Sequence, residues 1–156
     1  MTEILINPAR TCAFTGHRAM EQGYDTKDLL DKINKLIDIG YDTFLVGMAL
    51  GFDTLVFNLL EEVRKTKNIR IIACIPCINQ AYKFNKAQKI EYERMLDCAN
   101  ERIYVGKEYT DKCMLKRNEF MVKNSSCLIA YVRRNYGGSA YTVKYATKKG
   151  VTVISV

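Results

Sequence analysis

Long apolar runs are absent from this chain of 156 residues, and histidine is almost absent. No apolar run approaches the roughly 20 residues that a membrane-spanning helix needs. Residues 1–10 lack the apolar core of a signal peptide, so we expect a cytoplasmic protein without a membrane partner. His17 is the only histidine, and there is no second Cys-x-x-Cys pair. Soft ligands at suitable spacing are therefore too few for a structural zinc site, and we expect neither a metal nor a cofactor.

Linkers, low-complexity tracts and internal repeats are missing as well. The composition, 48% hydrophobic and 26% charged, is that of an ordinary globular chain, which disfavours disorder and fibrous repeats. At roughly 100 to 200 residues per domain, the length supports one domain over residues 1–156. Residues 1–10 are the one segment that we expect to form a loose arm.

A second proline late in the chain is also missing, and this affects how the cysteines are interpreted. Cys74-Ile75-Pro76-Cys77 lies between a predicted strand and a predicted helix, as in a redox active site. A thioredoxin-like fold would follow such a pair with a cis-proline, but the only other proline is Pro8. Because the expected cytosol keeps thiols reduced, we interpret Cys74 as a core residue and keep redox chemistry as an alternative.

Basic residues exceed acidic ones, which favours an anionic partner. Lysine and arginine number 24 against 17 aspartates and glutamates, a formal net charge of +7 at neutral pH. Basicity alone does not distinguish DNA, RNA, a membrane surface and a phosphorylated small molecule. The charge therefore defines the class of ligand only.

Hydrophobic periodicity predicts six strands alternating with five helices. The expected strands cover residues 11–15, 43–46, 69–75, 102–105, 127–132 and 151–156. The expected helices cover about 29–37, 53–65, 84–98, 111–123 and 141–149. Continuous apolar strands that are each separated by a helix indicate a mainly parallel sheet covered on both faces. The predicted fold is a doubly wound α/β sheet.

Three glycine-bearing turns directly follow predicted strands: Thr15-Gly16-His17-Arg18, Gly47 to Asp53 with Gly51, and Gly137-Gly138-Ser139. Strand-to-helix turns need glycine in any case, so one such turn is weak evidence. In doubly wound sheets, however, ligands bind at the carboxyl ends of the strands, where helix N-termini present unpaired N–H groups. Three glycine turns at one edge therefore favour a phosphate-binding site.

Several side chains near these turns each have a functional and a structural interpretation. The guanidinium of Arg18 can fork onto a phosphate, or be an ordinary surface group. His17 can donate to a phosphate or ribose oxygen, but orienting or packing is its more usual role. Asp53 accepts ribose hydroxyls or, more safely, caps backbone N–H groups.

The last predicted helix carries the best candidate phosphate site. Ser139 and Thr142 lie one turn apart at its start, where hydroxyl and N–H groups converge on an anion, although simple N-capping by Ser139 competes. Arg117 and Asn118 are expected to reach the same cleft, unless they belong to a solvated helix face. Gln80 follows another strand end, with an ordinary loop residue as its alternative.

The order and spacing of these motifs resemble the SLOG superfamily, and within it the YpsA-like branch. The resemblance spans about residues 11–156 and includes Pro76, Gln80, Arg117, Asn118, Met121 and Thr142 together with the three turns. The superfamily groups the DNA-processing protein DprA with the LONELY GUY phosphoribohydrolases. It implies a Rossmann-like domain that binds nucleotides or nucleotide-derived ligands, and it implies a homodimer.

One departure from the phosphoribohydrolase pattern bears on catalysis. Those enzymes carry a glutamate on the helix after the glycine-rich turn, partnered by an arginine that Arg117 resembles. The helix after Gly138 reads Ser-Ala-Tyr-Thr-Val-Lys-Tyr and holds no carboxylate. Glycosidic cleavage needs a carboxylate that stabilises an oxocarbenium-like state or activates water. Asp53 and Glu119 are substitutes in principle, so the sequence leans against an enzyme without excluding one.

Three functions follow from these observations. The first is binding of a nucleotide-derived ligand, ADP-ribose-like or NAD-like, by a sensor, carrier or sequestering module. The alternatives are a nucleotide N-glycosidase and, because Gly47 to Asp53 resembles a DprA motif, binding of single-stranded nucleic acid. Tyr131, Tyr136, Tyr141 and Tyr145 are candidates for stacking on a base, with core or dimer packing as the alternative for two of them.

Overall fold

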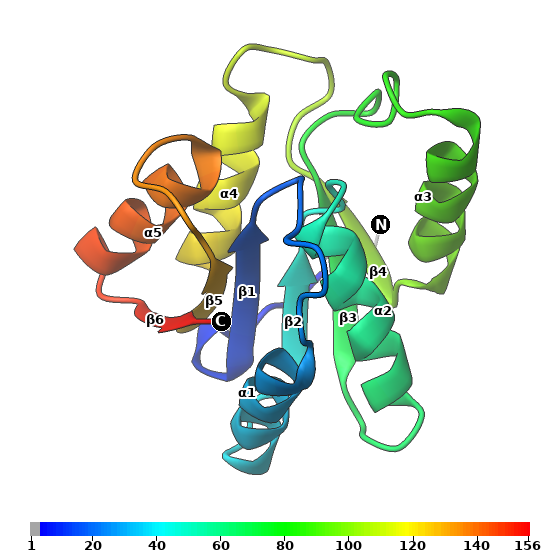
Figure 1. Ribbon diagram of the computed structural model, residues 1–156. Coiled ribbons are helices and arrows are strands. Elements are labelled where there is room, and N and C mark those ends of the chain that lie inside the picture. The colour runs from blue at the N-terminus through cyan, green and yellow to red at the C-terminus, as the bar shows by residue number, and fades with distance from the viewer. Residues whose placement is uncertain (1–3) are drawn as a thin grey trace.

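The computed structural model describes residues 4–156 and contains one six-stranded sheet in which every neighbouring pair is parallel. The strand order is β4-β3-β2-β1-β5-β6. The strands are β1 (Thr11–Gly16), β2 (Thr43–Val46), β3 (Arg70–Ile75), β4 (Glu101–Tyr104), β5 (Cys127–Tyr131) and β6 (Thr152–Ser155). All carboxyl ends therefore lie at one edge of the sheet, the upper edge in Figure 1.

Five α-helices alternate with the strands and cover both faces of the sheet. They are α1 (Lys27–Asp38), α2 (Phe52–Arg64), α3 (Lys86–Cys98), α4 (Cys113–Lys123) and α5 (Gly138–Lys148). Buried apolar side chains of α1, α2 and α3 belong to one core cluster, whereas Met121 and Val122 of α4 and Ala146 of α5 belong to another (Figure 1). The predicted doubly wound α/β fold with its sequence of elements is confirmed. The α5 helix begins three residues earlier than the periodicity predicts, because glycines 137 and 138 form its start instead of a preceding turn.

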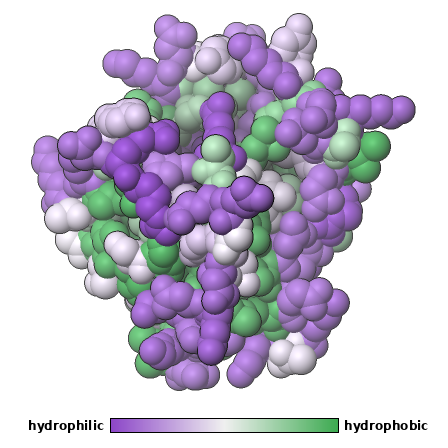
Figure 2. All heavy atoms as spheres, in the orientation of Figure 1, coloured by the Kyte–Doolittle hydropathy of each residue, from purple (hydrophilic) through white to green (hydrophobic). Residues whose placement is uncertain are grey.

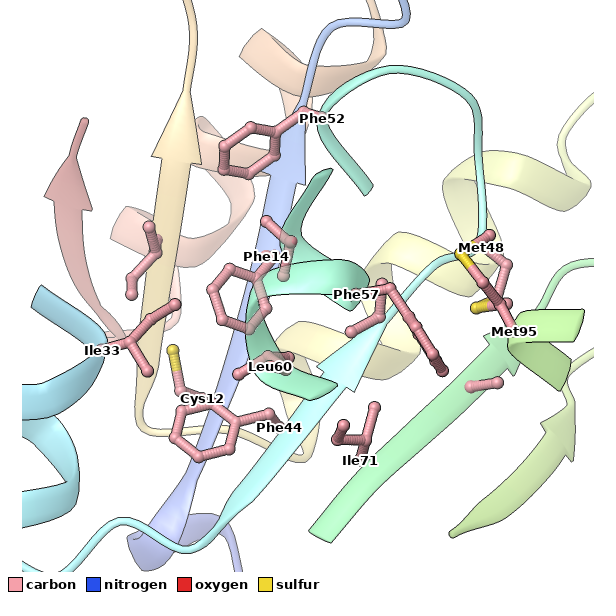
Figure 3. Close-up of a cluster of buried hydrophobic side chains, with 14 of the residues drawn as sticks. Cys12, Phe14, Ile33, Phe44, Met48, Phe52, Phe57, Leu60, Ile71 and Met95 are labelled. Carbon is pink, nitrogen blue, oxygen red and sulfur yellow. The ribbon is translucent and has the colours of Figure 1, made fainter. Parts of the chain in front are cut away.

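The strands build two cores because successive side chains point to opposite faces. In β1, Cys12 and Phe14 face the larger cluster, where Phe14 and Phe44 lie with ring centroids 6.1 Å apart (Figure 3). Ala13, between them, faces the smaller cluster with Leu128 of β5. Every residue of β5 is buried, as the continuous apolar run predicts.

Residues 4–10 precede β1 and make defined contacts. Ile4 and Ile6 pack against the smaller core cluster, whereas Leu5 is exposed. A short 3-10 helix at Pro8–Arg10 is capped by Asn7, whose side chain accepts a hydrogen bond from the Ala9 N–H. The arm expected over residues 1–10 is thus attached to the domain over residues 4–10, and residues 1–3 lie outside the described part of the chain.

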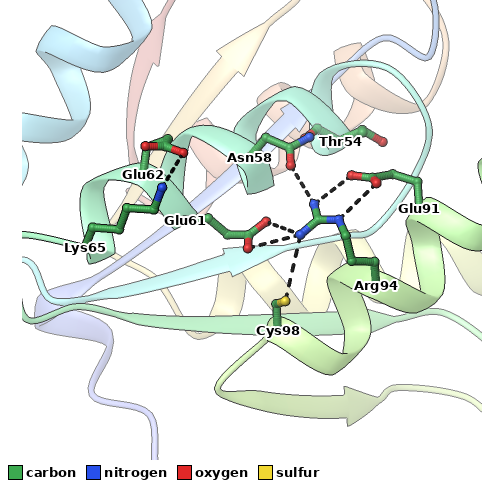
Figure 4. A network of polar contacts seen from close by, with 8 residues as sticks. All are labelled: Thr54, Asn58, Glu61, Glu62, Lys65, Glu91, Arg94 and Cys98. Atoms are coloured by element: carbon green, nitrogen blue, oxygen red, sulfur yellow. Dashed lines mark hydrogen bonds and ion pairs between the residues drawn. The ribbon is translucent and has the colours of Figure 1, made fainter.

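One polar network ties α2 to α3 at the surface. The Arg94 guanidinium contacts carboxylate oxygens of Glu61 at 3.0 Å and Glu91 at 2.7 Å, and it donates to Asn58 at 2.7 Å (Figure 4). The arginine side chain is 41% exposed, so solvent screens these charges and each pair contributes little to stability. The network orients α3 relative to α2. It does not belong to the edge of the sheet where the strands have their carboxyl ends.

The face of the molecule drawn in Figure 2 is mainly polar. Figure 2 shows hydrophilic side chains over most of one face, with smaller apolar patches between them. Within residues 4–156, no helix combines the length and apolar character needed to cross a membrane.

The strand order reverses beside β1. From β1 the chain adds β2, β3 and β4 on one side, and α4 then leads to β5 on the other side of β1. The loops after β1 and β5 therefore diverge and leave a crevice between them, which is the usual ligand position in open α/β sheets.

Candidate functional site

A cleft of about 440 Å³ occupies this crevice at the carboxyl end of β1. It is formed by the ends of β1 and β5, the turn before α2, the inner side of α4 and the start of α5. Its lining comprises Phe14, Thr15, Gly16, His17, Arg18, Ala19, Ala49, Asp53, Met114, Arg117, Asn118, Arg134, Gly138 and Ser139. The three predicted glycine turns thus meet at one site.

The turn before α2 is packed directly against the loop after β1. Gly51 has a φ of +79°, and an added Cβ would overlap the Arg18 carbonyl. The Phe52 N–H donates to the His17 carbonyl at 3.1 Å. A Cβ on Gly16 would in turn overlap the Phe52 ring. Glycine is required here because two backbones and an aromatic ring approach one another closely.

Arg117 forms the floor of the cleft. Its side chain comes from α4 and is nearly fully buried, with 4% of the residue exposed. The guanidinium donates to the carbonyls of Gly47, after β2, and Cys74, in β3. Its Nε donates to Oδ1 of Asn118 at 2.7 Å. Arg117 therefore connects the ends of two strands to α4, which is a structural role that the motif alone did not reveal.

Asp53 lies beside this guanidinium at the first turn of α2. It is 7% exposed, and its carboxylate accepts a hydrogen bond from the Ala49 N–H at 3.1 Å. Burial raises the pKa of Asp53, and the positive charge of Arg117 opposes that shift. Burial likewise lowers the pKa of Arg117, with Asp53 as the main opposing group. The two opposite charges compensate each other at the cleft floor, and Asp53 organises the Gly47 to Gly51 turn.

His17 lies in the cleft wall next to β5. Its Nε2 accepts a hydrogen bond from the Arg133 N–H at 2.8 Å, which requires a neutral ring with the proton on Nδ1. Burial lowers the pKa of His17, and the nearby charges of Arg134 and Arg133 lower it further. The structure therefore holds His17 neutral as an acceptor that joins β1 to the loop after β5.

The start of α5 faces the cleft without an acidic residue in its first turn. The helix has Gly137 as its N-cap, so the first N–H groups are not covered by a capping side chain. Ser139 does not cap the helix, because its hydroxyl donates to the Gly16 carbonyl at 2.8 Å. Thr142 is buried and accepts a hydrogen bond from Asn118 at 3.0 Å, so it fixes Asn118 beneath the cleft.

Positive charge predominates around this opening. The lining holds Arg18, Arg117 and Arg134 against the single carboxylate of Asp53. Arg18 and Arg134 are exposed and stand on opposite sides of the cleft, one after β1 and one after β5. Together with the positive end of the α5 dipole, they can bind an anion.

Most of the predicted ligand-binding residues meet in this cleft, and the rest have other positions. Gly16, His17, Arg18, Asp53, Arg117, Asn118, Gly138 and Ser139 are part of the lining. Gly47, Gly51, Gly137 and Thr142 lie behind it and shape its turns. Gln80 lines a neighbouring hollow, where it donates to the Gly47 carbonyl at 3.0 Å. Glu119 lies outside the cleft and accepts a hydrogen bond from the Tyr141 hydroxyl at 2.8 Å.

Sequence reasoning missed Arg134, Phe14, Ala19 and Met114 as lining residues. Arg134 follows β5 by only a few positions, and a basic residue so close to a strand end is the signal that was available for it. Phe14, Ala19 and Met114 carry no chemical signal, because apolar side chains are common everywhere in such a chain.

The cysteines are placed as core residues. Cys74 is fully buried, and burial raises its pKa to about 12. Cys77 lies beside Cys113 of α4, with the two Sγ atoms 3.9 Å apart, and burial again raises its pKa. A redox site needs an accessible thiol with a lowered pKa, so the Cys-x-x-Cys alternative is not supported.

The tyrosines near the glycine pair do not form one stacking surface. Tyr131 is buried, with its ring stacked 5.6 Å from Phe52. Tyr141 and Tyr145 stack on each other at 6.3 Å. Tyr136 is 68% exposed, beside Arg134. Core packing therefore accounts for Tyr131.

A comparison with protein families agrees with this arrangement. The model of the YspA SLOG family matches residues 12–152, which includes every cleft residue and the sheet apart from Thr11 and residues 153–155. The chain belongs to the YspA SLOG family. The expected resemblance to the SLOG superfamily and its YpsA-like branch is thereby confirmed. A curated relative of this SLOG protein is the uncharacterized SPbeta prophage-derived protein YoqJ of Bacillus subtilis, 28% identical over 135 residues, 78% of this chain and 75% of YoqJ.

Solved structures share the fold of this SLOG protein at low identity. DNA processing protein A (DprA) from Streptococcus pneumoniae superposes with a TM-score of 0.65 at 18% identity, over 94% of this chain and 50% of its own. The protein of the same name from Helicobacter pylori, described with a single-stranded DNA binding mode, gives 0.63 at 19% identity, over 96% and 65%. The SLOG protein thus spans only half to two-thirds of these proteins.

Replacing Arg117 with methionine is expected to lower the free energy of unfolding by about 3 to 5 kcal/mol, because it leaves Asp53 buried without its opposite charge. Arg94→Met is the control, since the exposed Arg94 network is worth about 1 kcal/mol or less. Urea denaturation measures both. Adding Asp53→Asn to Arg117→Met should recover part of the loss. Equal losses in the two single variants would contradict the structural role of Arg117.

Gly51→Ala should destabilise the fold more than Gly40→Ala. Both glycines have positive φ, so both variants carry a backbone strain of about 1 kcal/mol. An added Cβ at Gly40 meets nothing within 4 Å, whereas at Gly51 it overlaps the Arg18 carbonyl. Thermal and urea unfolding of the two variants would therefore separate the cost of backbone strain from the cost of the overlap with the Arg18 carbonyl. If Gly40→Ala lowered the free energy of unfolding as much as Gly51→Ala, the result would contradict the close approach of Gly51 to the Arg18 carbonyl.

His17 should make stability depend on pH near neutrality. Because its folded pKa lies below its ordinary value of 6.5, the unfolded chain takes up a proton first. The free energy of unfolding should then fall as pH drops from about 7 to about 5, and this loss should be smaller in His17→Gln. The chain has no other histidine, so the difference between the two pH profiles isolates this group. Parallel profiles would show that His17 is not held neutral.

Proposed function

We propose that this SLOG protein binds a nucleotide-derived ligand, of the ADP-ribose or NAD-like class, without cleaving it. The observation that supports this is the pair of exposed arginines, Arg18 and Arg134, on either side of a cleft into which α5 directs its N-terminus. Helix N-termini at the strand-order reversal of an α/β sheet bind phosphates through N–H groups and the helix dipole. Arginine adds bidentate contacts to phosphate oxygens.

The buried groups support binding rather than hydrolysis. Arg117 is hydrogen-bonded to two backbone carbonyls, and Asp53 accepts an N–H bond from its own turn, so both have structural partners. Glu119 lies outside the cleft, and α5 carries no carboxylate near Gly138. A glycosidase needs a carboxylate beside the sugar, and neither candidate is free for this step. We therefore favour a sensor, carrier or sequestering module, and its homodimer stays a prediction.

Single-stranded DNA is the second candidate, favoured by the fold shared with the two DprA structures. The same arginines would then contact strand phosphates. Such binding depends on the release of counterions and falls steeply as salt is raised.

Isothermal titration with AMP, ADP-ribose, NAD and cyclic ADP-ribose tests the first proposal. We expect at least one of them to bind, and we expect Arg18→Ala and Arg134→Ala each to weaken binding by about tenfold or more. Arg10→Ala is the matched control, because this exposed arginine precedes β1 and so lies at the opposite edge of the sheet. The Arg10→Ala variant should bind each nucleotide with the affinity of the wild type.

Two outcomes would count against nucleotide binding. The first is a folded protein that binds nothing in the panel. The second is binding that Arg18→Ala and Arg134→Ala leave unchanged. Tighter binding of an oligothymidylate than of any nucleotide, with a steep salt dependence, would favour single-stranded DNA instead. Chromatography of the titrated mixtures would detect a released base. Such a product would favour the N-glycosidase function instead.

A further inference from the structure

A second hollow, of about 380 Å³, adjoins the strand-end cleft and has a different chemical character. We call it the aromatic hollow. It lies between the loops after β3 and β4, and it is lined by Arg18, Ala49, Leu50, Asn79, Gln80, Tyr82, Lys83, Phe84, Tyr109 and Met114. Arg18, Ala49 and Met114 belong to both linings, so the two spaces lie on either side of these three residues.

The aromatic rings of this hollow are exposed to an unusual degree. Tyr82 is 76% exposed and Tyr109 is 61% exposed, although both lie on loops at the edge of a well-packed domain. Phe84 is different, because its ring packs edge-on against Tyr92 at 5.6 Å and forms a fixed wall. Large exposed aromatic side chains that gather around one concavity mark a binding site rather than a core.

The polar groups behind the hollow are already fixed in place. Gln80 is 8% exposed, donates to the Gly47 carbonyl at 3.0 Å and accepts from the Tyr92 hydroxyl at 3.0 Å. It therefore holds the loop after β3 against the turn before α2. Besides the rings, the lining holds the cations of Arg18 and Lys83 and the exposed amide of Asn79.

We propose that the aromatic hollow is a nucleobase subsite. The inference rests on the proposed function, with the phosphate in the strand-end cleft and the ligand passing Arg18. The base would stack on Tyr82 or Tyr109 and contact Met114, because aromatic rings and a thioether attract the π face of any base. An extended nucleotide thus has one subsite for its charge and another for its ring.

The test compares AMP with ribose 5-phosphate, which carries the same phosphate but no base. The wild type is expected to bind AMP more tightly, and the double variant Tyr82→Ala, Tyr109→Ala should lose about tenfold or more of its AMP affinity. Its affinity for ribose 5-phosphate should not change. Tyr104→Ala is the matched control, because Tyr104 is 49% exposed at the end of β4 and lines neither the aromatic hollow nor the strand-end cleft.

A second readout does not depend on affinity. The chain contains no tryptophan, so its intrinsic fluorescence comes from tyrosine. AMP should quench this emission in the wild type and in Tyr104→Ala, and quench it less in the double variant, whereas ribose 5-phosphate should have no effect. Displacement of AMP by a short oligoadenylate, with the same loss in the double variant, would also support a base subsite and identify a strand as its source.

The possible failures differ from one another. Equal affinity of the wild type for AMP and ribose 5-phosphate would overturn the base subsite and leave phosphate binding in place. Parallel loss of both ligands in the double variant would also overturn it, because the tyrosines would then only support the cleft. A folded wild type that binds neither of these two ligands would overturn the subsite, and failure to bind any nucleotide of the panel above would overturn the proposed function with it.

Discussion

The buried guanidinium of Arg117 is the interaction on which the rest of the site depends. It connects α4 to the carbonyls of Gly47 and Cys74, and so holds the carboxyl ends of two neighbouring strands at a fixed separation. A charge buried this deeply is tolerated only with compensation, which Asp53 and three hydrogen-bond acceptors supply. Because Asp53 also accepts the Ala49 N–H, the same charge pair shapes the turn that leads into α2.

Backbone contacts extend this order across the strand-end edge. The turn at Gly51 lies against the Arg18 carbonyl, and Ser139 joins the start of α5 to the Gly16 carbonyl. His17 adds a link from β1 to the loop after β5. Each link uses a polar side chain or a glycine that a motif search assigns to the ligand. In this protein, many of the motif residues build the cleft, whereas Arg18 and Arg134 are exposed at its opening.

Membership of the SLOG family and likeness to DprA describe a scaffold rather than one activity. A doubly wound sheet places helix N-termini and turns at one edge, and the chemistry there depends on a few side chains. Three features matter here. The α5 helix carries no carboxylate, the Asp53 carboxylate is paired with the buried Arg117, and aromatic rings line the aromatic hollow. Our proposal that a nucleotide is bound and left intact rests on these features.

The sequence by itself determined the alternation of six strands and five helices, the parallel sheet and the edge at which the motifs gather, because periodicity and glycine turns are local properties of the chain. It also identified most residues of the cleft lining. Only the tertiary structure decided their roles: that Arg117 is buried, that Thr142 supports Asn118, that Gln80 belongs to another hollow and that Tyr131 packs in the core. Those roles depend on which distant segments meet, such as α4 with the ends of β2 and β3, and no local pattern in the sequence records such a meeting.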